Sequence, residues 1–491
     1  MFATVLLVLL TLILFSISLL LGQKSKKDPP GPIPWPFFGN QILLKRLKRE
    51  LGAQHAVFME LGKRYDSDVI SVHLGNDKVL VVNGFKLITT VMKSDDYDGR
   101  PWNEFIKIRN MGKKSGITMN DGTEWKELRG WMVRTMKFFG LGKSEMSEML
   151  KNELLNMVEN LKTKGGPRKM KSLITPAVVN VLWYLATGTP FLDGKKLQFF
   201  SDLLETRSKA FDMAGGWLST FPWIRYIAPE SSGYNVLMTL NNELRNFLLE
   251  SIREHKKNYK PGSEADLIDM FLHEMEDHTE YDTVYTEEQL VIILVDLFIA
   301  GCTTTGTTVD FLFLHMAVHQ DVQRKLQKEI DSVIPRDRIP DLDDRPKLPY
   351  VEAVMSESQR LWPVFPIVGP RRVLRDTDLD KYTIPKESTV LMNSFSISRD
   401  PNLYTDPEKF IPERYIKNGA FVPDPYSLQF GKGRRRCPGE ALAKAASFIL
   451  FVGVMQKFNI LPVPGKGPTT IEVTFGITTS PKPYEILAVP R

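Results

Sequence analysis

The order of apolar and polar residues along the chain predicts several long helices and a hairpin. Residues 2–22 carry no charge and are dominated by Leu, Val, Ile and Phe, which suffices for one helix across a bilayer. Val69–Val82 consists of two β-branched runs around a Gly-Asn-Asp turn and predicts a β-hairpin. A Thr-Glu-Glu-Gln start at Thr286 resembles a capping box, and an apolar helical pattern continues from it to about Val318. Ala441–Phe458 predicts another helix, largely apolar.

The charges around the first apolar segment favour an anchor over a signal peptide. A cleaved signal peptide has a basic start, a shorter apolar core and a cleavage site of small residues. Here the positive charges follow the segment instead, at Lys24, Lys26 and Lys27. The positive-inside rule then places the rest of the chain in the cytosol. We therefore expect an uncleaved, single-pass transmembrane helix at residues 1–22.

A proline-rich stretch, Pro29–Pro36, comes next and is typical of a stiff polyproline spacer. With the lysines before it, this stretch makes a basic and proline-rich hinge at residues 23–40. We expect the hinge to hold the folded domain, residues 41–491, at a fixed angle to the membrane.

Composition narrows the classes of protein that are possible. The chain has 491 residues, of which 43% are hydrophobic and 25% charged, and these proportions are typical of a globular protein. The net charge of +6 is mild, and no basic cluster with interleaved aromatic residues indicates nucleic-acid binding. Two cysteines in so long a chain indicate a reducing compartment and no disulfide framework.

One of these cysteines, Cys437, lies in a basic and glycine-rich loop just before a predicted helix. A free cysteine is most often a small buried hydrophobe. Here, however, Gly433 allows a tight turn, and Pro438 favours the first turn of a helix. Free amide groups at a helix start stabilise a thiolate, which ligates soft or borderline metals. Because two cysteines cannot build a four-thiolate site, an axial thiolate on a haem iron fits best.

The loop resembles the haem-binding loop of the cytochrome P450 family. Every constrained position of that pattern is filled, by Phe430, Gly433, Arg435, Cys437 and Gly439. The resemblance implies a mainly α (α+β) fold, with a large helical domain around a long central helix and a smaller β-rich region. It also implies haem b, oxidation of a lipophilic molecule by O₂, and the endoplasmic reticulum membrane. No dinucleotide or flavin motif occurs, so the expected electron donor is NADPH–cytochrome reductase.

The resemblance also assigns haem contacts outside the loop. Trp125 and Arg129 are four residues apart, on one helical face. The family uses this spacing to hydrogen-bond a haem propionate, and a planar guanidinium suits a carboxylate. Arg100 and Arg371 occupy two further positions at which the family places propionate contacts.

The middle of the predicted central helix resembles the oxygen-activation motif of the family. Ala300, Gly301, Thr304 and Thr305 match it, but Thr303 stands where an acid is expected. Thr304 and an ordered water are expected to supply the protons for O–O cleavage, by a rerouted or slower path. The missing acid leaves open epoxidation, N-oxidation, or a reductase-independent isomerase or dehydratase. A non-catalytic haem binder is the third class considered.

The remaining features concern the frame, the pocket and the partner. By resemblance, Glu357, Arg360 and Arg414 form a buried network behind the cysteine loop. The expected pocket wall comprises Val364, Phe365, Ile367 and Val368, a C-terminal turn near 476–478 between short strands in 471–489, and a lid at 215–224. A basic docking face for the reductase would comprise Lys126, Lys137, Lys432, Arg434 and Lys444. The sequence is similar to the animal microsomal branch, whose insect members include juvenile-hormone and ecdysteroid enzymes and detoxifying enzymes.

Overall fold

The computed structural model describes residues 11, 13, 16, 27–139, 144–163, 165–210, 217–278, 283–476 and 478–491. The predicted anchor at 1–22 therefore lies outside the described residues, apart from three positions. Among the described residues, one helix, α13 (Glu287–Val318), is long and apolar enough to cross a membrane. Of its most apolar stretch, 67% is buried inside the protein, as in the core helix of a globular domain.

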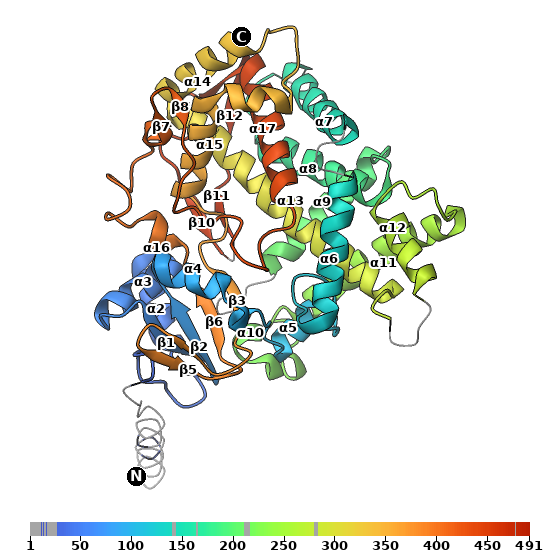
Figure 1. The fold of residues 1–491 in the computed structure, drawn as a ribbon. Coiled ribbons are helices and arrows are strands. Elements are labelled where there is room, and N and C mark those ends of the chain that lie inside the picture. Colours follow the sequence, from blue (N-terminus) through green and yellow to red (C-terminus); the bar gives the residue numbers. More distant parts are fainter. Residues whose placement is uncertain are drawn as a thin grey trace.

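Helices make up most of the fold, as predicted (Figure 1). The first half of the chain contains α2 (Gln41–Leu51), α3 (Gln54–Arg64), α4 (Phe85–Lys93), α5 (Glu104–Arg109), α6 (Gly122–Phe139), α7 (Ser144–Thr163), α8 (Lys171–Thr187), α9 (Gly194–Ala210), α10 (Trp217–Thr220) and α11 (Tyr234–Asn258). The second half contains α12 (Leu267–Asp277), α13, α14 (Gln320–Val333), α15 (Pro349–Leu361), α16 (Phe395–Ser398) and α17 (Glu440–Lys457). Short 3₁₀ turns lie at Asp95–Tyr97, Pro222–Tyr226, Leu342–Lys347 and Pro412–Tyr415.

A smaller β-rich region lies beside the helical body, at the lower left of Figure 1. Its sheet has the order β1-β2-β6-β3, formed by β1 (Val69–Leu74), β2 (Asp77–Val82), β6 (Thr389–Met392) and β3 (Val368–Arg372). The first two strands are the predicted hairpin. Two-stranded sheets pair β4 (Thr377–Leu379) with β5 (Tyr382–Ile384), β7 (Ile416–Lys417) with β8 (Ala420–Phe421), β9 (Phe458–Pro462) with β12 (Ile486–Pro490), and β10 (Val473–Phe475) with β11 (Thr479–Pro481).

The long helix α13 runs diagonally through the body and packs against α8 and α17 (Figure 1). Its start is only half of the predicted capping box. The Thr286 hydroxyl accepts a hydrogen bond from the Gln289 N–H at 3.2 Å. The Gln289 side chain does not return it, because its oxygen accepts from the Gly116 N–H at 3.0 Å. The start of α13 is thereby tied to the loop before α6.

The described part of the proline hinge lies along β1. The Ser71 N–H donates to the Pro30 carbonyl at 2.7 Å. A Cβ on Gly31 would lie 1.9 Å from the Ser71 carbonyl oxygen, so the close approach requires glycine here. Asn40 accepts from the His73 N–H at 2.7 Å and fixes the end of the hinge before α2. These contacts set the direction in which the hinge leaves the folded domain.

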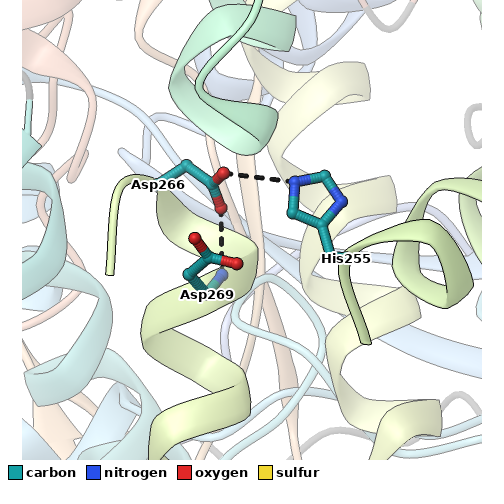
Figure 2. Close-up of side chains that lie close together, drawn as sticks. All are labelled: His255, Asp266 and Asp269. Carbon is teal, nitrogen blue, oxygen red and sulfur yellow. Dashed lines mark hydrogen bonds and ion pairs between the residues drawn. The ribbon is translucent and has the colours of Figure 1, made fainter. Parts of the chain in front are cut away.

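A partly buried ion pair ties α11 to α12, and Figure 2 shows it. His255 Nε2 lies 3.1 Å from Asp266 Oδ2, and His255 Nδ1 lies 2.8 Å from the Ser251 carbonyl. Asp266 also caps α12 by accepting from the Asp269 N–H at 2.9 Å. Since both ring nitrogens of His255 are engaged within the protein, we interpret the cluster as a helix clamp.

Candidate active site

The loop before α17 has a tightly constrained backbone. Gly431 and Gly433 both adopt φ of +70°, a region that glycine enters without strain. A Cβ on Gly433 would lie 2.2 Å from the Met92 carbonyl oxygen at the end of α4, so no larger residue fits. The Cys437 N–H donates to the Phe430 carbonyl at 2.8 Å and closes the loop.

The cysteine itself stands at the start of a buried helix. Cys437 is exposed, and α17 begins at Glu440. Partial burial raises the pKa of the Cys437 thiol, while the Gly439 N–H and the Arg129 guanidinium act to lower it. Cys302, by contrast, is buried, and burial raises the pKa of its thiol to about 12. Cys437 is therefore the cysteine whose sulfur is accessible and has hydrogen-bond and charge partners suited to a thiolate.

Three predicted arginines meet on one side of this loop. Arg371 Nη1 donates to Asp98 Oδ1 at 3.1 Å, and the Asp98 carbonyl accepts from Arg435 Nε at 3.0 Å. Arg100 Nη1 donates to the Pro370 carbonyl at 2.5 Å. In addition to burial, the charges of Arg371 and Arg435 lower the pKa of Arg100, and the charge of Arg371 lowers the pKa of Arg435, so the three charges lie close together.

The arginine cluster has more positive charge than its immediate partners neutralise. Arg100 Nε and Arg435 Nη1 are buried and have no hydrogen-bond partner. Burial, followed by the neighbouring arginines, lowers the pKa of Arg435 to about 9 and lowers the pKa of Arg100 as well. Buried guanidinium groups without anions are costly. The residues present therefore fit an anionic group with two carboxylates, such as the propionates of haem b.

Trp125 and Arg129 contact the cysteine loop directly. The Trp125 indole N–H donates to the Ile117 carbonyl at 3.2 Å, and the Arg435 guanidinium lies 3.6 Å from the centre of its ring. Arg129 Nη2 donates to the Arg436 carbonyl, next to Cys437 in the chain. Phe430 is half-buried below the ammonium group of Lys444, which lies 5.2 Å from the centre of its ring.

The centre of α13 has an accessible face within an otherwise buried helix. Ala300 is exposed, and Thr303 and Thr304 are half-buried. The Thr304 hydroxyl donates to the Ala300 carbonyl at 2.7 Å, and the Thr303 hydroxyl lies 3.3 Å from that of Ser208 on α9. A Cβ on Gly301 would lie 2.8 Å from the Leu182 side chain, so close packing with α8 explains this glycine. The accessible face of α13 therefore lies beside two threonine hydroxyls.

The predicted Glu–Arg–Arg network is confirmed, and it joins α15 to the segment that precedes α17. Arg360 binds the fully buried Glu357 through two nitrogens, at 2.8 and 2.9 Å. Arg414 Nε donates to the same carboxylate at 3.0 Å. Both guanidinium groups lie over the ring of Tyr404, whose hydroxyl donates to Asp424 at 2.8 Å. The network thus fixes the chain between α15 and α17.

The predicted pocket walls come together from distant segments. The Thr479 N–H donates to the Val364 carbonyl at 2.8 Å, so the C-terminal strands lie beside the segment before β3. Phe365 is 39% exposed, whereas Val364, Ile367 and Val368 are half-buried. Ile477 of the predicted C-terminal turn and the first two residues of the predicted lid, 215 and 216, lie outside the described residues.

Sequence reasoning missed several buried polar residues on α9, α11 and α13. Arg207 is 2% exposed, Asn241 is 2% exposed and Asp296 is 8% exposed. Each lies on an apolar helix face, as Arg207 does with Leu203 and Leu204. The sequence signal that could have found the two charged residues is their position on an apolar helix face. A charged side chain at such a position needs a partner when it is buried.

The chain is similar to known proteins along almost its whole length. A family model described as Cytochrome P450 matches residues 29–488. The chain is 36% identical to the probable cytochrome P450 305a1 of Drosophila melanogaster, over 96% of this chain and 95% of that protein. It is 33% identical to the farnesoate epoxidase of Bombyx mori, over 99% and 98%. It is also 33% identical to cytochrome P450 2J5 of Mus musculus, over 97% and 94%.

Proposed function

This chain belongs to the cytochrome P450 family of haem-binding monooxygenases, and from that premise we propose its particular reaction. It inserts one oxygen atom of O₂ into a lipophilic small molecule, with electrons from NADPH–cytochrome reductase. It does so on the cytosolic face of the endoplasmic reticulum membrane, held there by residues 1–22.

This proposal rests on one observation. The Cys437 thiol is accessible, and the arginine cluster near it has more positive charge than its partners neutralise. The thiolate of Cys437 would ligate the haem iron, and Arg100, Arg371 and Arg435 would neutralise the propionates. When bound, haem b supplies the iron at which O₂ is activated by two electrons. Trp125 orients Arg435, and Arg129 holds the loop through the Arg436 carbonyl.

Proton delivery falls to the hydroxyl groups on α13. Thr304 Oγ1 holds a proton at the accessible face, where it is donated to the Ala300 carbonyl. Rotation about the Thr304 side chain would turn this O–H toward the pocket, where the hydroxyl can donate its proton and accept another from water. Thr303 replaces the acid of the family motif, and its hydroxyl partner is Ser208. The paired hydroxyl groups of Thr303 and Ser208 therefore take the place of a carboxylate in the proposed proton path.

Exposed aromatic residues support attachment to a membrane. Trp35, Phe37 and Phe38 of the hinge and Trp223 of the lid are all exposed. The Phe38 and Phe221 rings meet edge to face at 5.7 Å, so hinge and lid lie together. Aromatic residues prefer the level of the lipid headgroups. We propose that this surface rests on the bilayer beside the anchor.

The substrate is proposed to be a lipophilic molecule of the terpenoid, steroid or xenobiotic type. The pocket segments around Phe365 are apolar, which favours such molecules. The Bombyx mori relative is named as an epoxidase of farnesoate, a sesquiterpenoid. This name makes terpenoids the first compounds to test.

One observation favours a second candidate, a haem-thiolate isomerase or dehydratase that needs no reductase. It is the lack of an acid at Thr303, where two hydroxyl groups meet instead. Turnover that requires both NADPH and the reductase excludes this candidate. Turnover with neither component excludes the monooxygenase.

The decisive test is the absorption band of the reduced, CO-bound protein. Cys437→Ser is expected to abolish the band of a thiolate-ligated haem, because a serine hydroxyl cannot replace the thiolate. Cys302→Ser, which changes the buried cysteine, is the matched control and should leave the band in place. A thiolate band that survives in Cys437→Ser would mean that another residue is the ligand.

A further inference from the structure

The C-terminal end of α9 carries a buried arginine. Arg207 is 2% exposed and follows Leu203 and Leu204 at helical spacing, on the apolar face of α9. A guanidinium at such a position is always charged at neutral pH and needs compensation by an anion or by hydrogen bonds. The partners of Arg207 therefore decide what this residue does.

The hydrogen-bond partners of Arg207 are both neutral. Its Nε donates to Asn241 Oδ1 at 2.7 Å, and its Nη2 donates to the Arg109 carbonyl at 2.9 Å. Asn241 is itself fixed, because its amide nitrogen donates to the Ile108 carbonyl at 3.1 Å. Arg207 forms no ion pair with any carboxylate in the described ranges. Burial, followed by the charge of Arg109, lowers the pKa of Arg207 to about 9.

The carboxylate whose charge acts on Arg207 is already used elsewhere. Asp296 Oδ2 accepts hydrogen bonds from the Ile117 and Thr118 N–H groups, both at 2.8 Å. This carboxylate holds the loop before α6 and makes no ion pair with Arg207. Among the described residues, Arg207 is therefore a buried guanidinium that is held by a side-chain amide and a backbone carbonyl, and no carboxylate forms an ion pair with it.

The position of Arg207 relates it to the accessible face of α13. Asp296, Ala300 and Thr303 lie on one side of that helix, at spacings of four and three residues. Arg207 interacts electrostatically with Asp296, and the adjacent Ser208 contacts Thr303. The end of α9 thus spans the turns of α13 on both sides of the exposed Ala300. A ligand above Ala300 would therefore lie next to the end of α9 that carries Arg207.

We propose that Arg207 binds a carboxylate group of the substrate, which makes lipophilic carboxylic acids the substrate class. The inference rests on the proposed function, because it takes the space above Ala300 as the substrate pocket. A guanidinium has five N–H donors, and Arg207 uses two of them within the described residues. Asn241 and the Arg109 carbonyl hold the fork in place, and a carboxylate accepts the remaining donors in a charge-assisted geometry. The apolar tail then lies along the accessible face of α13.

The experiment measures dissociation constants from the substrate-induced change in haem absorption of the purified, haem-loaded full chain. The probes are farnesoic, lauric and palmitoleic acids, each paired with its methyl ester. At least one acid is expected to bind tenfold or more tightly than its ester. Arg207→Gln should weaken binding of that acid by tenfold or more, about 1.4 kcal/mol, and leave binding of the ester unchanged. Arg207→Lys should retain part of the preference.

The matched control is Arg253→Gln, the same change at an exposed arginine of α11. It should bind acid and ester as the unchanged protein does. The proposal is overturned if no acid shifts the spectrum or if every ester binds as tightly as its acid. The proposal is also overturned if Arg207→Gln weakens the binding of acid and ester equally, since that result indicates a structural role. If Arg207→Gln does not fold, the ratio of the acid and ester dissociation constants of the unchanged protein tests the proposal.

Failure of the proposed function gives a different result. In that case the reduced protein lacks the CO-bound band of a thiolate-ligated haem, whatever ligand is added. A normal band together with equal affinity for acid and ester rejects the carboxylate site alone.

Discussion

The guanidinium of Arg435 lies 3.6 Å from the centre of the Trp125 indole ring. The ring is fixed in turn, because its N–H donates to the Ile117 carbonyl. Stacking of this kind stabilises a partly desolvated cation. The arrangement joins α6 to the cysteine loop. It also means that Trp125, one predicted propionate contact, orients Arg435, which is another.

We expect Arg435→Gln to lower haem retention, because it removes a buried positive charge from the propionate side. The measurement is the ratio of haem to protein after purification and dialysis against a haem acceptor, and a several-fold drop is expected. Arg434→Gln is the matched control, since Arg434 is exposed and pairs with Asp95 at the surface. Equal retention in both variants would show that the arginine cluster does not hold haem.

The Glu357 network should be a major source of stability. Glu357→Gln leaves the guanidinium groups of Arg360 and Arg414 without their buried anion. Breaking a buried pair in this way costs roughly 3–5 kcal/mol. Thermal or denaturant unfolding of the haem-loaded protein measures the loss. Glu413→Gln, at an exposed pair with Lys325, should cost less than about 1 kcal/mol, and similar costs for the two variants would contradict this account.

Thr304→Ala should divert reducing equivalents to hydrogen peroxide, because the hydroxyl at the accessible face is lost. The measurement compares NADPH consumed with product and peroxide formed, and peroxide should rise several-fold per NADPH. Thr308→Ala is a suitable control. Thr308 makes the same type of back-bond, to the Thr304 carbonyl at 2.9 Å, one turn further along α13. Unchanged coupling in Thr304→Ala would place the proton path elsewhere.

The basic docking face should control the reaction with the reductase. Lys126 and Lys137 are exposed on α6, the helix that reaches the cysteine loop through Arg129. Replacing both lysines with glutamate should raise the KM for the reductase and weaken its dependence on salt, since long-range attraction between charges is screened by ions. Binding of substrate should stay the same. An unchanged KM would remove these lysines from the interface.

The His255–Asp266 clamp gives a pH dependence of defined sign. Burial acts to lower the pKa of His255, but the hydrogen bond and charge of Asp266 outweigh it and raise the pKa to about 9, from 6.5. Asp269 is the other charged group in the cluster and acts in the same direction. A raised pKa means that the stabilisation is fully present below pH 6.5 and is lost as the pH rises through about 9.

We expect the melting temperature of the unchanged protein to exceed that of His255→Gln at pH 6. The difference should shrink toward pH 10. Hydrogen exchange of the α12 amides reports the same loss locally, because Asp266 caps that helix. His278→Gln, at an exposed histidine of the same region, is the control and should show no such trend. A difference that is constant with pH would exclude the clamp as its source.

The sequence by itself determined the structural elements that depend only on residues close together in the chain. The turn at Gly433, Cys437 and the helix after it lie within a few residues of each other, so one short pattern predicts the geometry of the cysteine loop. The central helix and the Val69–Val82 hairpin follow in the same way from unbroken periodicity and turn residues. The Glu357 network was also predicted, although only through resemblance to a family, since its spacing alone is typical of a surface pair.

Only the tertiary structure decided which polar groups meet across distant segments. Gln289 looks like the second half of a capping box, yet it binds Gly116. Trp125 and Arg435 stack on each other, and the charge of Arg207 has no carboxylate partner among the described residues. Pairwise contacts between distant segments leave no periodic signal in the chain, because each depends on where the helices pack. The proposed anchoring of a substrate therefore depends on how the helices pack, whereas the proposed metal ligand, Cys437, is identified by a short local pattern in the sequence.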